Sequence, residues 1–233
     1  MIKAFIFDFD EVLVRTEDAS PHHAWDQRLG LAPGSVERAI RHSDLWIQAQ
    51  LGRVTPKAFW TGVAEMLYMR REDVAELRRD FYGGDRLNYR LVELLRDLRE
   101  RGCTLALLAN DSIELETRLA ELGLDALFDH VLISAQIGVM KPDVTAFRVA
   151  LQTVGAAPCE ALLIDDSLTH VRAAQSLGMP AILVRHGTDV RAELQPYLDN
   201  PAPKSGADLH RPAPTGILSG RGPVRRLVCR SLR

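Results

Sequence analysis

The sequence predicts an α/β fold, in which a doubly wound parallel sheet carries a small helical segment inserted after its first strand. The chain opens on the apolar run 2–7, which is rich in β-branched and aromatic residues and is typical of a buried strand. From residue 87 to residue 184, segments with helical spacing alternate with short apolar runs. Such alternation is typical of a parallel sheet that helices cover on both faces.

The stretch between these two parts has helical spacing and little strand character. Helices are expected near 21–29, 35–50, 55–68 and 72–82. Gly83 and Gly84 then break the pattern, and they favour either a hinge or a plain surface turn. We therefore expect a helical cap at residues 17–84 and a core domain at residues 1–16 and 85–199.

The rest of the core is expected to consist of four helix and strand pairs. In chain order they are helix 88–101, strand 104–108, helix 112–122, strand 131–133, helix 143–154, strand 161–164, helix 168–177 and strand 181–184.

Composition is typical of a soluble globular protein. Of the 233 residues, 26% are charged and 46% are hydrophobic. We find no apolar stretch of about 18 residues that could span a membrane, and no leader pattern for secretion. Cys103, Cys159 and Cys229 lie far apart and form no metal-binding or disulfide pattern. We expect a cytoplasmic protein with no membrane partner, and the sequence does not indicate an oligomeric state.

Residues 200–233 are rich in proline, glycine and arginine, and they are expected to form a disordered basic tail. Basic tails attract nucleic acid, but no aromatic residue is interleaved with these arginines. A solvated terminus is therefore favoured over a nucleic-acid site.

Charged and polar residues follow the predicted core strands. Asp8 and Asp10 come after the first strand, and the later groups are Asn110, Lys141 and the pair Asp165 and Asp166. The carboxyl ends of parallel strands share one edge of the sheet, so these side chains are expected to converge. Crowded carboxylates need a cation, and oxygen ligands without cysteine or histidine favour Mg²⁺.

This set of groups suits phosphoryl transfer. Mg²⁺ and Lys141 would offset the charge of a phosphate while Asp8 attacks it in line. Asp10 would protonate the leaving alkoxide and then deprotonate the water that hydrolyses the aspartyl phosphate. Backbone N–H groups at Ala109 and the side chain of Asn110 would contact the phosphate.

With these motifs in this order, residues 1–190 resemble the haloacid dehalogenase-like superfamily, a large group of mostly Mg²⁺-dependent phosphatases with a Rossmann-like core. Asp8-Phe9-Asp10 is similar to the first motif, Ala109-Asn110 to the second, Lys141-Pro142-Asp143 to the third and Asp165-Asp166 to the fourth. The helical segment resembles the cap that follows the first motif.

The resemblance implies that Asp8 is the phosphoryl acceptor and Asp10 the acid and base. It implies that Ala109, Asn110 and Lys141 bind the substrate phosphate. The metal ligands would be Asp8, Asp165, Asp166 and the backbone carbonyl of Asp10. The expected function is that of a Mg²⁺-dependent phosphatase of a small, sugar phosphate-like metabolite.

Two positions depart from the family pattern. Ala109 stands where serine or threonine is usual, and losing that hydroxyl should weaken phosphate binding by roughly 1.5 to 3 kcal/mol. Glu11 stands where glycine is common after the second aspartate. We expect a slowed enzyme rather than an inactive one.

Three alternatives stay open from the sequence. A phosphomutase uses the same two aspartates, and Thr16, His22, His23 and Trp25 faintly resemble that branch, although we expect Trp25 in the core and both histidines at the surface. Ala109 and the basic tail would also suit a non-catalytic binding or regulatory protein. A signalling receiver domain fits poorly, because its acidic pair comes early in the chain.

The cap residues Trp46, Arg53 and Trp60 are equally compatible with substrate contact and with packing or surface positions. The sequence therefore does not identify the substrate.

Overall fold

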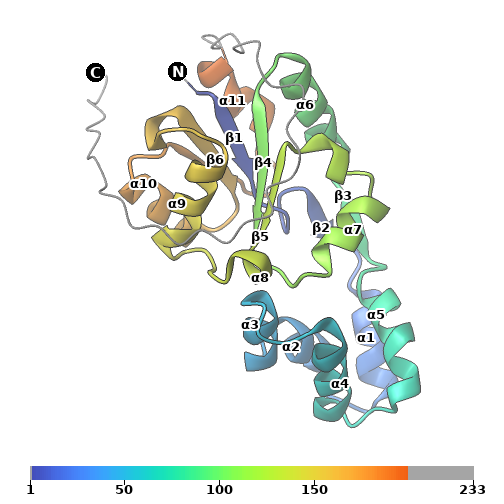
Figure 1. The fold of residues 1–233 in the computed structure, drawn as a ribbon. Coiled ribbons are helices and arrows are strands. Elements are labelled where there is room, and N and C mark those ends of the chain that lie inside the picture. Colours follow the sequence, from blue (N-terminus) through green and yellow to red (C-terminus); the bar gives the residue numbers. More distant parts are fainter. Residues whose placement is uncertain (1, 199–233) are drawn as a thin grey trace.

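A computed structural model describes residues 2–198 of the chain. It contains an α/β core with a helical cap beneath one end of the sheet (Figure 1). The core sheet has the order β5-β4-β1-β6-β7, and all of its strand pairs are parallel. These strands are β1 (Ala4–Phe7), β4 (Thr104–Ala109), β5 (His130–Ile133), β6 (Ala161–Asp165) and β7 (Ala181–Leu183). The predicted doubly wound sheet is confirmed.

The strand β1 lies in the middle of the sheet, and its register aligns the strand ends that carry the charged residues. Phe7 pairs with Leu107 of β4 and with Ile164 of β6. Asp8 and Asp165, each one residue further on, therefore leave the sheet side by side.

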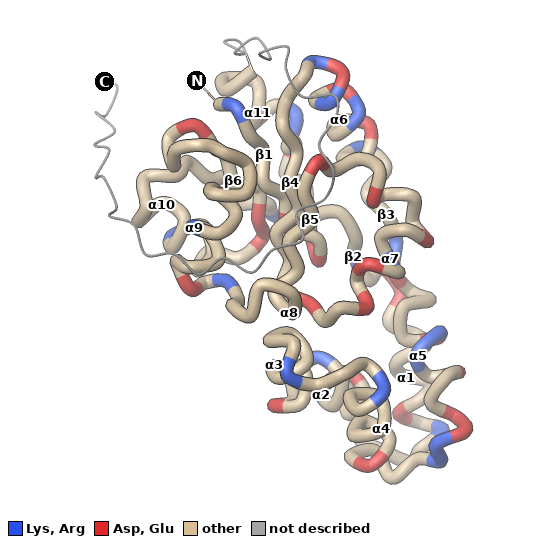
Figure 2. Tube along the Cα trace, viewed as in Figure 1, with Lys and Arg blue, Asp and Glu red and all other residues tan. Residues whose placement is uncertain are grey.

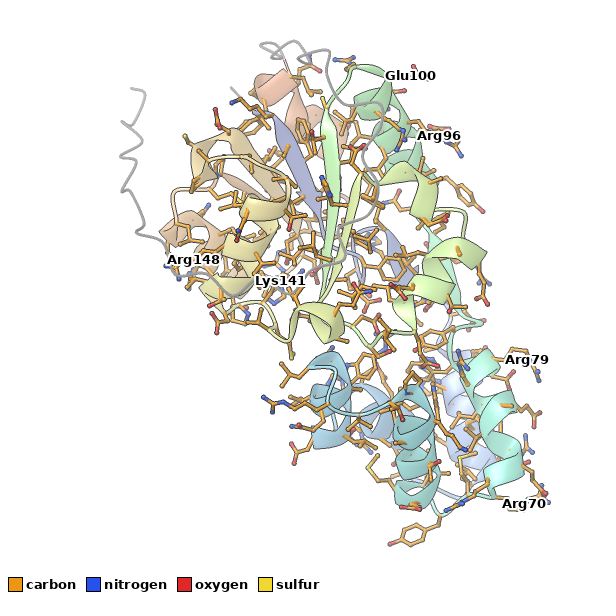
Figure 3. All side chains as sticks on the ribbon, in the orientation of Figure 1. Arg70, Arg79, Arg96, Glu100, Lys141 and Arg148 are labelled. Carbon is orange, nitrogen blue, oxygen red and sulfur yellow. The ribbon has the colours of Figure 1, made fainter. Side chains whose placement is uncertain are left out.

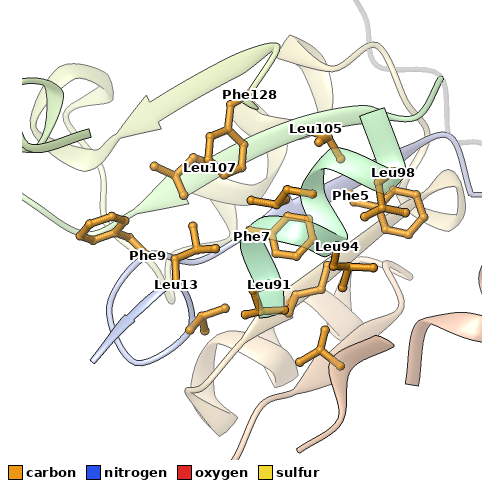
Figure 4. Close-up of a cluster of buried hydrophobic side chains, with 14 of the residues drawn as sticks. Phe5, Phe7, Phe9, Leu13, Leu91, Leu94, Leu98, Leu105, Leu107 and Phe128 are labelled. Carbon is orange, nitrogen blue, oxygen red and sulfur yellow. The ribbon is translucent and has the colours of Figure 1, made fainter. Parts of the chain in front are cut away.

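One face of the sheet is covered by α6 (Tyr89–Glu100), α7 (Leu115–Glu121) and α11 (Val190–Leu198). Side chains alternate along a strand, so Phe5 and Phe7 point to this face. Figure 4 shows both rings against Leu94 and Leu98 of α6. Burial of this apolar cluster stabilises the layer by roughly 1.5 to 3 kcal/mol for each large side chain.

The opposite face is covered by α9 (Val144–Thr153) and α10 (Leu168–Ser176). Ala4 and Ile6 of β1 point to this side, where they belong to a cluster that includes Phe147 of α9. Because both faces of β1 are buried, its sequence is continuously apolar.

The cap packs around a separate apolar cluster that includes Trp25, Trp46, Phe59 and Trp60. Its helices are α1 (Ser20–Arg28), α2 (Ser35–Arg41), α3 (Asp44–Gln50), α4 (Pro56–Met66) and α5 (Val74–Phe81), with a 3₁₀ turn at Arg71–Asp73 before α5. Trp25 lies in this core, as expected from the sequence.

The expected helix 35–50 is two helices. His42 and Ser43 leave the helical conformation, and the Ser43 side chain accepts a hydrogen bond from the backbone N–H of Trp46 at 3.2 Å. Serine at this position begins a new helix, because its oxygen satisfies a free N–H of the first turn.

The expectation of a surface position is wrong for His22 and correct for His23. His22 is 4% exposed, stacks on Phe81 at 4.3 Å and lies 2.8 Å from the Phe81 carbonyl oxygen through Nε2. His23, the next residue, is exposed. His22 therefore ties α1 to the end of α5.

Two short strands that we did not expect join the cap to the core. They are β2 (Val14–Thr16) and β3 (Asp85–Leu87), which form an antiparallel pair. Gly84 lies beside this pair, and its carbonyl oxygen accepts hydrogen bonds from the N–H groups of Glu17 and Asp18. A Cβ atom at Gly84 would come within 1.8 Å of the Asp18 carbonyl oxygen, so this glycine is required by close approach of two backbones.

Three further elements differ from the expectation. Helix α7 begins three residues late, after a turn in which the Leu115 N–H donates to the Ser112 carbonyl oxygen. The short helix α8 (Ser134–Ile137) and helix α11 were not expected. Pro196 in the last turn of α11 obscures its apolar spacing.

The expected tail at residues 200–233 lies outside the described residues. Within residues 2–198, no helix has both the length and the apolar character that crossing a bilayer requires.

We predict that Gly84→Ala destabilises the fold by about 1 to 3 kcal/mol, because the new methyl group would displace one of two adjacent backbone segments. Urea unfolding followed by circular dichroism would measure this. Gly83→Ala is the matched control, since a Cβ there would lie 3.1 Å from the Asp80 carbonyl oxygen and needs only a small shift. Equal losses in the two variants would contradict the role given to Gly84.

Candidate active site

The charged residues that follow the core strands meet at the carboxyl edge of the sheet. Asp8 follows β1 directly, Asn110 follows β4, and Asp165 is the last residue of β6. Lys141, which Figure 3 labels at this lower edge of the sheet, lies in the loop between α8 and α9. This edge also faces the cap (Figure 1).

The ammonium group of Lys141 bridges two carboxylates. Its Nζ lies 2.8 Å from Asp8 Oδ1 and 2.7 Å from Asp165 Oδ2. The side chains of Lys141 and Asp165 have no exposed area, and that of Asp8 is 10% exposed. Three charged groups are thus removed from water, which is tolerable only because each is paired.

Asn110 holds the backbone of Lys141 rather than pointing at an open site. Its Nδ2 donates to the Lys141 carbonyl oxygen at 2.7 Å, and its Oδ1 accepts from the Lys141 N–H at 2.8 Å. The amide therefore uses a donor and an acceptor to fix the loop that carries the ammonium. The cap reaches the same point, where Gln50 Nε2 donates to the Asn110 carbonyl oxygen at 3.0 Å.

The carboxylate of Asp165 is held on both oxygens. While Oδ2 accepts from Lys141, Oδ1 accepts from the Ser167 N–H at 2.8 Å and lies 2.9 Å from His170 Nδ1. His170 comes from the first turn of α10. The hydrogen bonds fix the position of Asp165 before any ligand binds.

The pKa values of this group move in opposite directions. Burial raises the pKa of Asp8 well above its usual range, with a further contribution from Asp165, and Lys141 only partly offsets this. Burial also acts to raise the pKa of Asp165, but hydrogen bonding to His170 and the charge of Lys141 outweigh it, so this pKa is lowered. Burial and then the neighbouring Asp165 raise the pKa of Asp166.

Two arginines flank Asp10. Arg41 from the cap helix α2 lies with Nη1 3.2 Å from Asp10 Oδ2, and Arg118 from α7 lies with Nη1 4.0 Å from Oδ1. Arg118 also makes a close ion pair with Asp85 of β3. The Asp10 side chain is 36% exposed, so it is more accessible than Asp8.

The remaining predicted residues have different surroundings. Ala109 is 2% exposed and packs in the apolar cluster of the α6 face. Asp166 is partly buried, and its carbonyl oxygen accepts a hydrogen bond from Arg185 at 3.4 Å. Glu11 adopts the left-handed conformation with φ 59°, so the turn keeps a glycine-like backbone at a cost of roughly 1 to 2 kcal/mol.

A cavity of about 380 Å³ lies between α5 of the cap and α7 of the core. Eight of the ten residues that line it are polar or charged, and they include Arg78, Tyr82, Asp111 and Arg118. Asp111 is 6% exposed, and burial, reinforced by the charge of Asp10 and opposed by Arg118, raises its pKa to about 7.

The donor groups at this edge fit a hard divalent cation. One potential ligand atom each from Asp8, Asp165 and His170 lies within 4.8 Å of the others, and Asp10 and Asp166 are sequence neighbours of this cluster. The sequence analysis did not expect a histidine here, but His170 Nδ1 already lies 2.9 Å from Asp165 Oδ1, so the oxygen ligands come from the carboxylates. Carboxylate oxygens that burial has deprived of water are suitable ligands for such an ion. The residues that could hold it are Asp8, the Asp10 carbonyl, Asp165 and Asp166.

Three groups at this site were not among the residues predicted from the sequence. His170 lies five residues after Asp165, in the first turn of the next helix, and that position was a usable signal. Arg41 and Arg118 carried no local signal, because each comes from a helix remote in sequence from Asp10. The cap tryptophans Trp46 and Trp60 prove to be 7% and 5% exposed, so they pack within the cap.

A family model for the haloacid dehalogenase-like hydrolases matches residues 2–178. The chain belongs to this family. The resemblance read from its four motifs is therefore confirmed, and the protein is a hydrolase of this fold.

Curated relatives include phosphatases. The chain is 28% identical over 151 residues to a sesquiterpene phosphatase of Aspergillus oryzae, covering 64% of this chain and 76% of that protein. It is 41% identical over 95 residues to a phosphoserine phosphatase of Thermus thermophilus, covering 40% of this chain and 38% of that protein. Drimenol cyclase of Aspergillus calidoustus is 26% identical over 215 residues, which are 87% of this chain but only 38% of the cyclase.

Among solved structures, an enzyme of the same family from Bacteroides thetaiotaomicron, in complex with magnesium and inorganic phosphate, superposes with a TM-score of 0.71. The match covers 84% of this chain and 100% of that chain at 20% sequence identity. At this identity the likeness shows a shared fold.

We predict that Asp111→Asn changes the pH dependence of stability. Between the ordinary pKa of 3.8 and its pKa of about 7 in the folded protein, Asp111 binds a proton when folded and has lost it when unfolded. The free energy of unfolding of the wild type therefore falls as the pH rises through this window, by at most about 1.4 kcal/mol per pH unit from this group. The Asp111→Asn variant lacks this fall.

Urea unfolding with EDTA at pH 5, 6, 7 and 8 would measure the difference between the variant and the wild type. The free energy of unfolding of the variant, relative to that of the wild type, should increase with pH up to about pH 7 and then level off. Asp125→Asn, at an exposed position, is the control. A difference that does not vary with pH would contradict the assignment.

Proposed function

We propose that this chain is a Mg²⁺-dependent phosphatase of a small phosphorylated metabolite, acting through an aspartyl phosphate on Asp8. The observation that carries the proposal is the bridge from Lys141 to Asp8 and Asp165, with Asp10 next to it at the same sheet edge. Family membership and the phosphatases among the relatives support it.

In the first step, a carboxylate oxygen of Asp8 attacks the phosphorus of the bound ester. The bond from phosphorus to the ester oxygen breaks, its electron pair stays on that oxygen, and the Asp10 carboxyl supplies the proton that makes a neutral alcohol. The Lys141 ammonium, which is fixed beside Asp8, offsets negative charge on the phosphate oxygens.

In the second step, water attacks the phosphorus of the aspartyl phosphate. Asp10 takes a proton from that water, the bond from phosphorus to the Asp8 oxygen breaks, and inorganic phosphate leaves. Both carboxylates return to their starting state, so no co-reactant other than water is needed.

A bound Mg²⁺, held by Asp8, the Asp10 carbonyl, Asp165 and Asp166, would add positive charge opposite the phosphate oxygens. Of these ligands, the Asp165 carboxylate is already held in place by its hydrogen bonds to Lys141, Ser167 and His170. Such preorganisation lowers the cost of assembling the site when the ion binds.

The cavity between α5 and α7 favours a polar metabolite over an apolar one. Its lining includes Arg78, Arg79, Glu114 and Glu121, and few apolar side chains. Arg78 and Glu114 pair with each other at 2.9 Å, but a long hydrocarbon group would displace water from Arg79 and Glu121, which is costly. We therefore propose a small polar ester, in contrast to the terpenoid substrate that the name of the Aspergillus oryzae relative indicates.

We predict that purified protein releases phosphate from small phosphate esters only when Mg²⁺ is present. Asp8→Asn should lower kcat by at least about 1,000-fold, because an amide cannot form the acyl phosphate. Asp10→Asn should lower it by about 100- to 10,000-fold through loss of proton transfer. Phosphate release on a panel of phosphorylated metabolites, with Mg²⁺ and with EDTA, would measure both effects.

Asp143→Asn provides the control, since this aspartate is exposed and its side chain caps α9. Full activity of Asp8→Asn would refute the proposal. Absence of turnover in wild-type protein on the whole panel would favour the non-catalytic alternative.

A further inference from the structure

Arg41 is a charged group near the site that the proposed reaction does not use. It is at the end of α2 in the cap, yet its Nη1 lies 3.2 Å from the Asp10 carboxylate of the core. The cap is close to the core at other points as well, where Trp60 Nε1 donates to Glu114 at 2.8 Å and Gln50 donates to Asn110. With the cap in this position, a guanidinium from the cap is in contact with the proton donor.

The two arginines beside Asp10 differ in their other partners. Arg118 makes a close ion pair with Asp85 and stacks over the Tyr82 ring at 4.3 Å. The charge of Arg118 is therefore paired with Asp85 even when Asp10 moves away from it. The ion pair of Arg41 within residues 2–198 is with Asp10, and the ring of Phe81 lies 5.3 Å from its guanidinium carbon.

In the proposed reaction, Asp10 gives its proton to the ester oxygen and therefore turns from Arg41 towards the substrate. Arg41, whose side chain is only 23% exposed, then loses a partner in a place with little water. Asp111 and Asp85 also act on the charge of Arg41, but neither makes an ion pair with it within residues 2–198. A charge without a paired anion in a place with little water is costly, so a substrate that supplies an anion there gains binding energy that a neutral one does not. The guanidinium edge suits a carboxylate or a phosphate, which it can bind through two hydrogen bonds.

The position of Arg41 also indicates which part of the substrate carries the anion. Lys141 contacts Asp8 and so serves the phosphate that is transferred, whereas Arg41 contacts Asp10 and so faces the leaving alcohol. The cavity lined by Tyr82, Asp111 and Arg118 reaches Asp10 through Arg118, whose Nη1 lies 4.0 Å from Asp10 Oδ1, and it has space for the remainder of that alcohol.

We propose that Arg41 is a specificity-determining residue, which binds a second anionic group on the leaving alcohol. The preferred substrates are then small phosphate monoesters that carry a carboxylate or a second phosphate near the ester oxygen. This inference rests on the proposed phosphatase function for the identity of the reacting group.

Three esters with one glycerol-type skeleton test it. They are 3-phosphoglycerate with a carboxylate, glycerol 1,3-bisphosphate with a second phosphate, and glycerol 3-phosphate with neither. We expect wild-type kcat/KM to be higher for one or both anionic esters than for glycerol 3-phosphate. Arg41→Met should lower that preference about 10- to 100-fold, the effect of losing a charged hydrogen-bond pair.

Two further variants serve as controls. Arg38→Met removes an exposed arginine one turn earlier on α2 and should leave the preference unchanged. Arg41→Lys keeps the charge and loses the two-pronged geometry, so its preference should lie between those of the wild type and Arg41→Met. This graded order would not arise from general loss of folding, which circular dichroism would check.

The inference is overturned if the wild type shows no preference for either anionic ester, or if Arg41→Met retains it. Should the wild type hydrolyse no ester, the phosphatase proposal fails separately. The inference is then decided by calorimetric binding of the same three esters to wild type and Arg41→Met in the presence of Mg²⁺. Equal affinities with and without the second anion would overturn it. The preferred anionic ester identifies the recognised group as carboxylate or phosphate.

Discussion

The contact of the Lys141 ammonium with Asp8 and Asp165 is the interaction on which the rest of the site depends. It joins the ends of β1 and β6 and the loop before α9 at one point, and all three groups are buried. Removing one member of such a set leaves an unpaired charge and typically costs about 3 to 5 kcal/mol. The charges that suit phosphate chemistry therefore also constrain this edge of the sheet.

Around this contact, hydrogen bonds between protein groups hold the charged side chains in position. Asn110 holds the backbone of Lys141, while His170 and the Ser167 N–H hold Asp165. Elsewhere in the described chain, acidic and basic residues are spread along the helices of the cap and along α6, as Figure 2 shows. The core domain supplies the groups that we propose for the reaction, and the cap supplies the group that we propose selects among substrates.

Much of the core could be predicted from the sequence, because burial on both faces leaves a continuous apolar run and parallel strands share one edge. For the same two reasons, Asp8, Lys141 and Asp165 could be expected to lie together. These reasons do not extend to β2 and β3, which have three residues each and mixed polarity, or to the break at Ser43, where a cap interrupts an apparently continuous helix. His22 was misjudged because a histidine that stacks on a ring and bonds to a carbonyl group has no sequence signature. Arg41 reaches Asp10 through the packing of the cap on the core, which no local pattern encodes.

The paired strands β2 and β3 have one more consequence. Thr16 pairs with Asp85, so the chain leaves the core and returns to it at neighbouring positions although 68 residues intervene. A segment whose two ends meet can be gained, lost or exchanged during evolution without disturbing the sheet, since the gap that its removal leaves is one strand spacing wide. The geometry of this junction therefore allows the cap, and with it substrate recognition, to change between related proteins while the residues at the edge of the sheet stay the same.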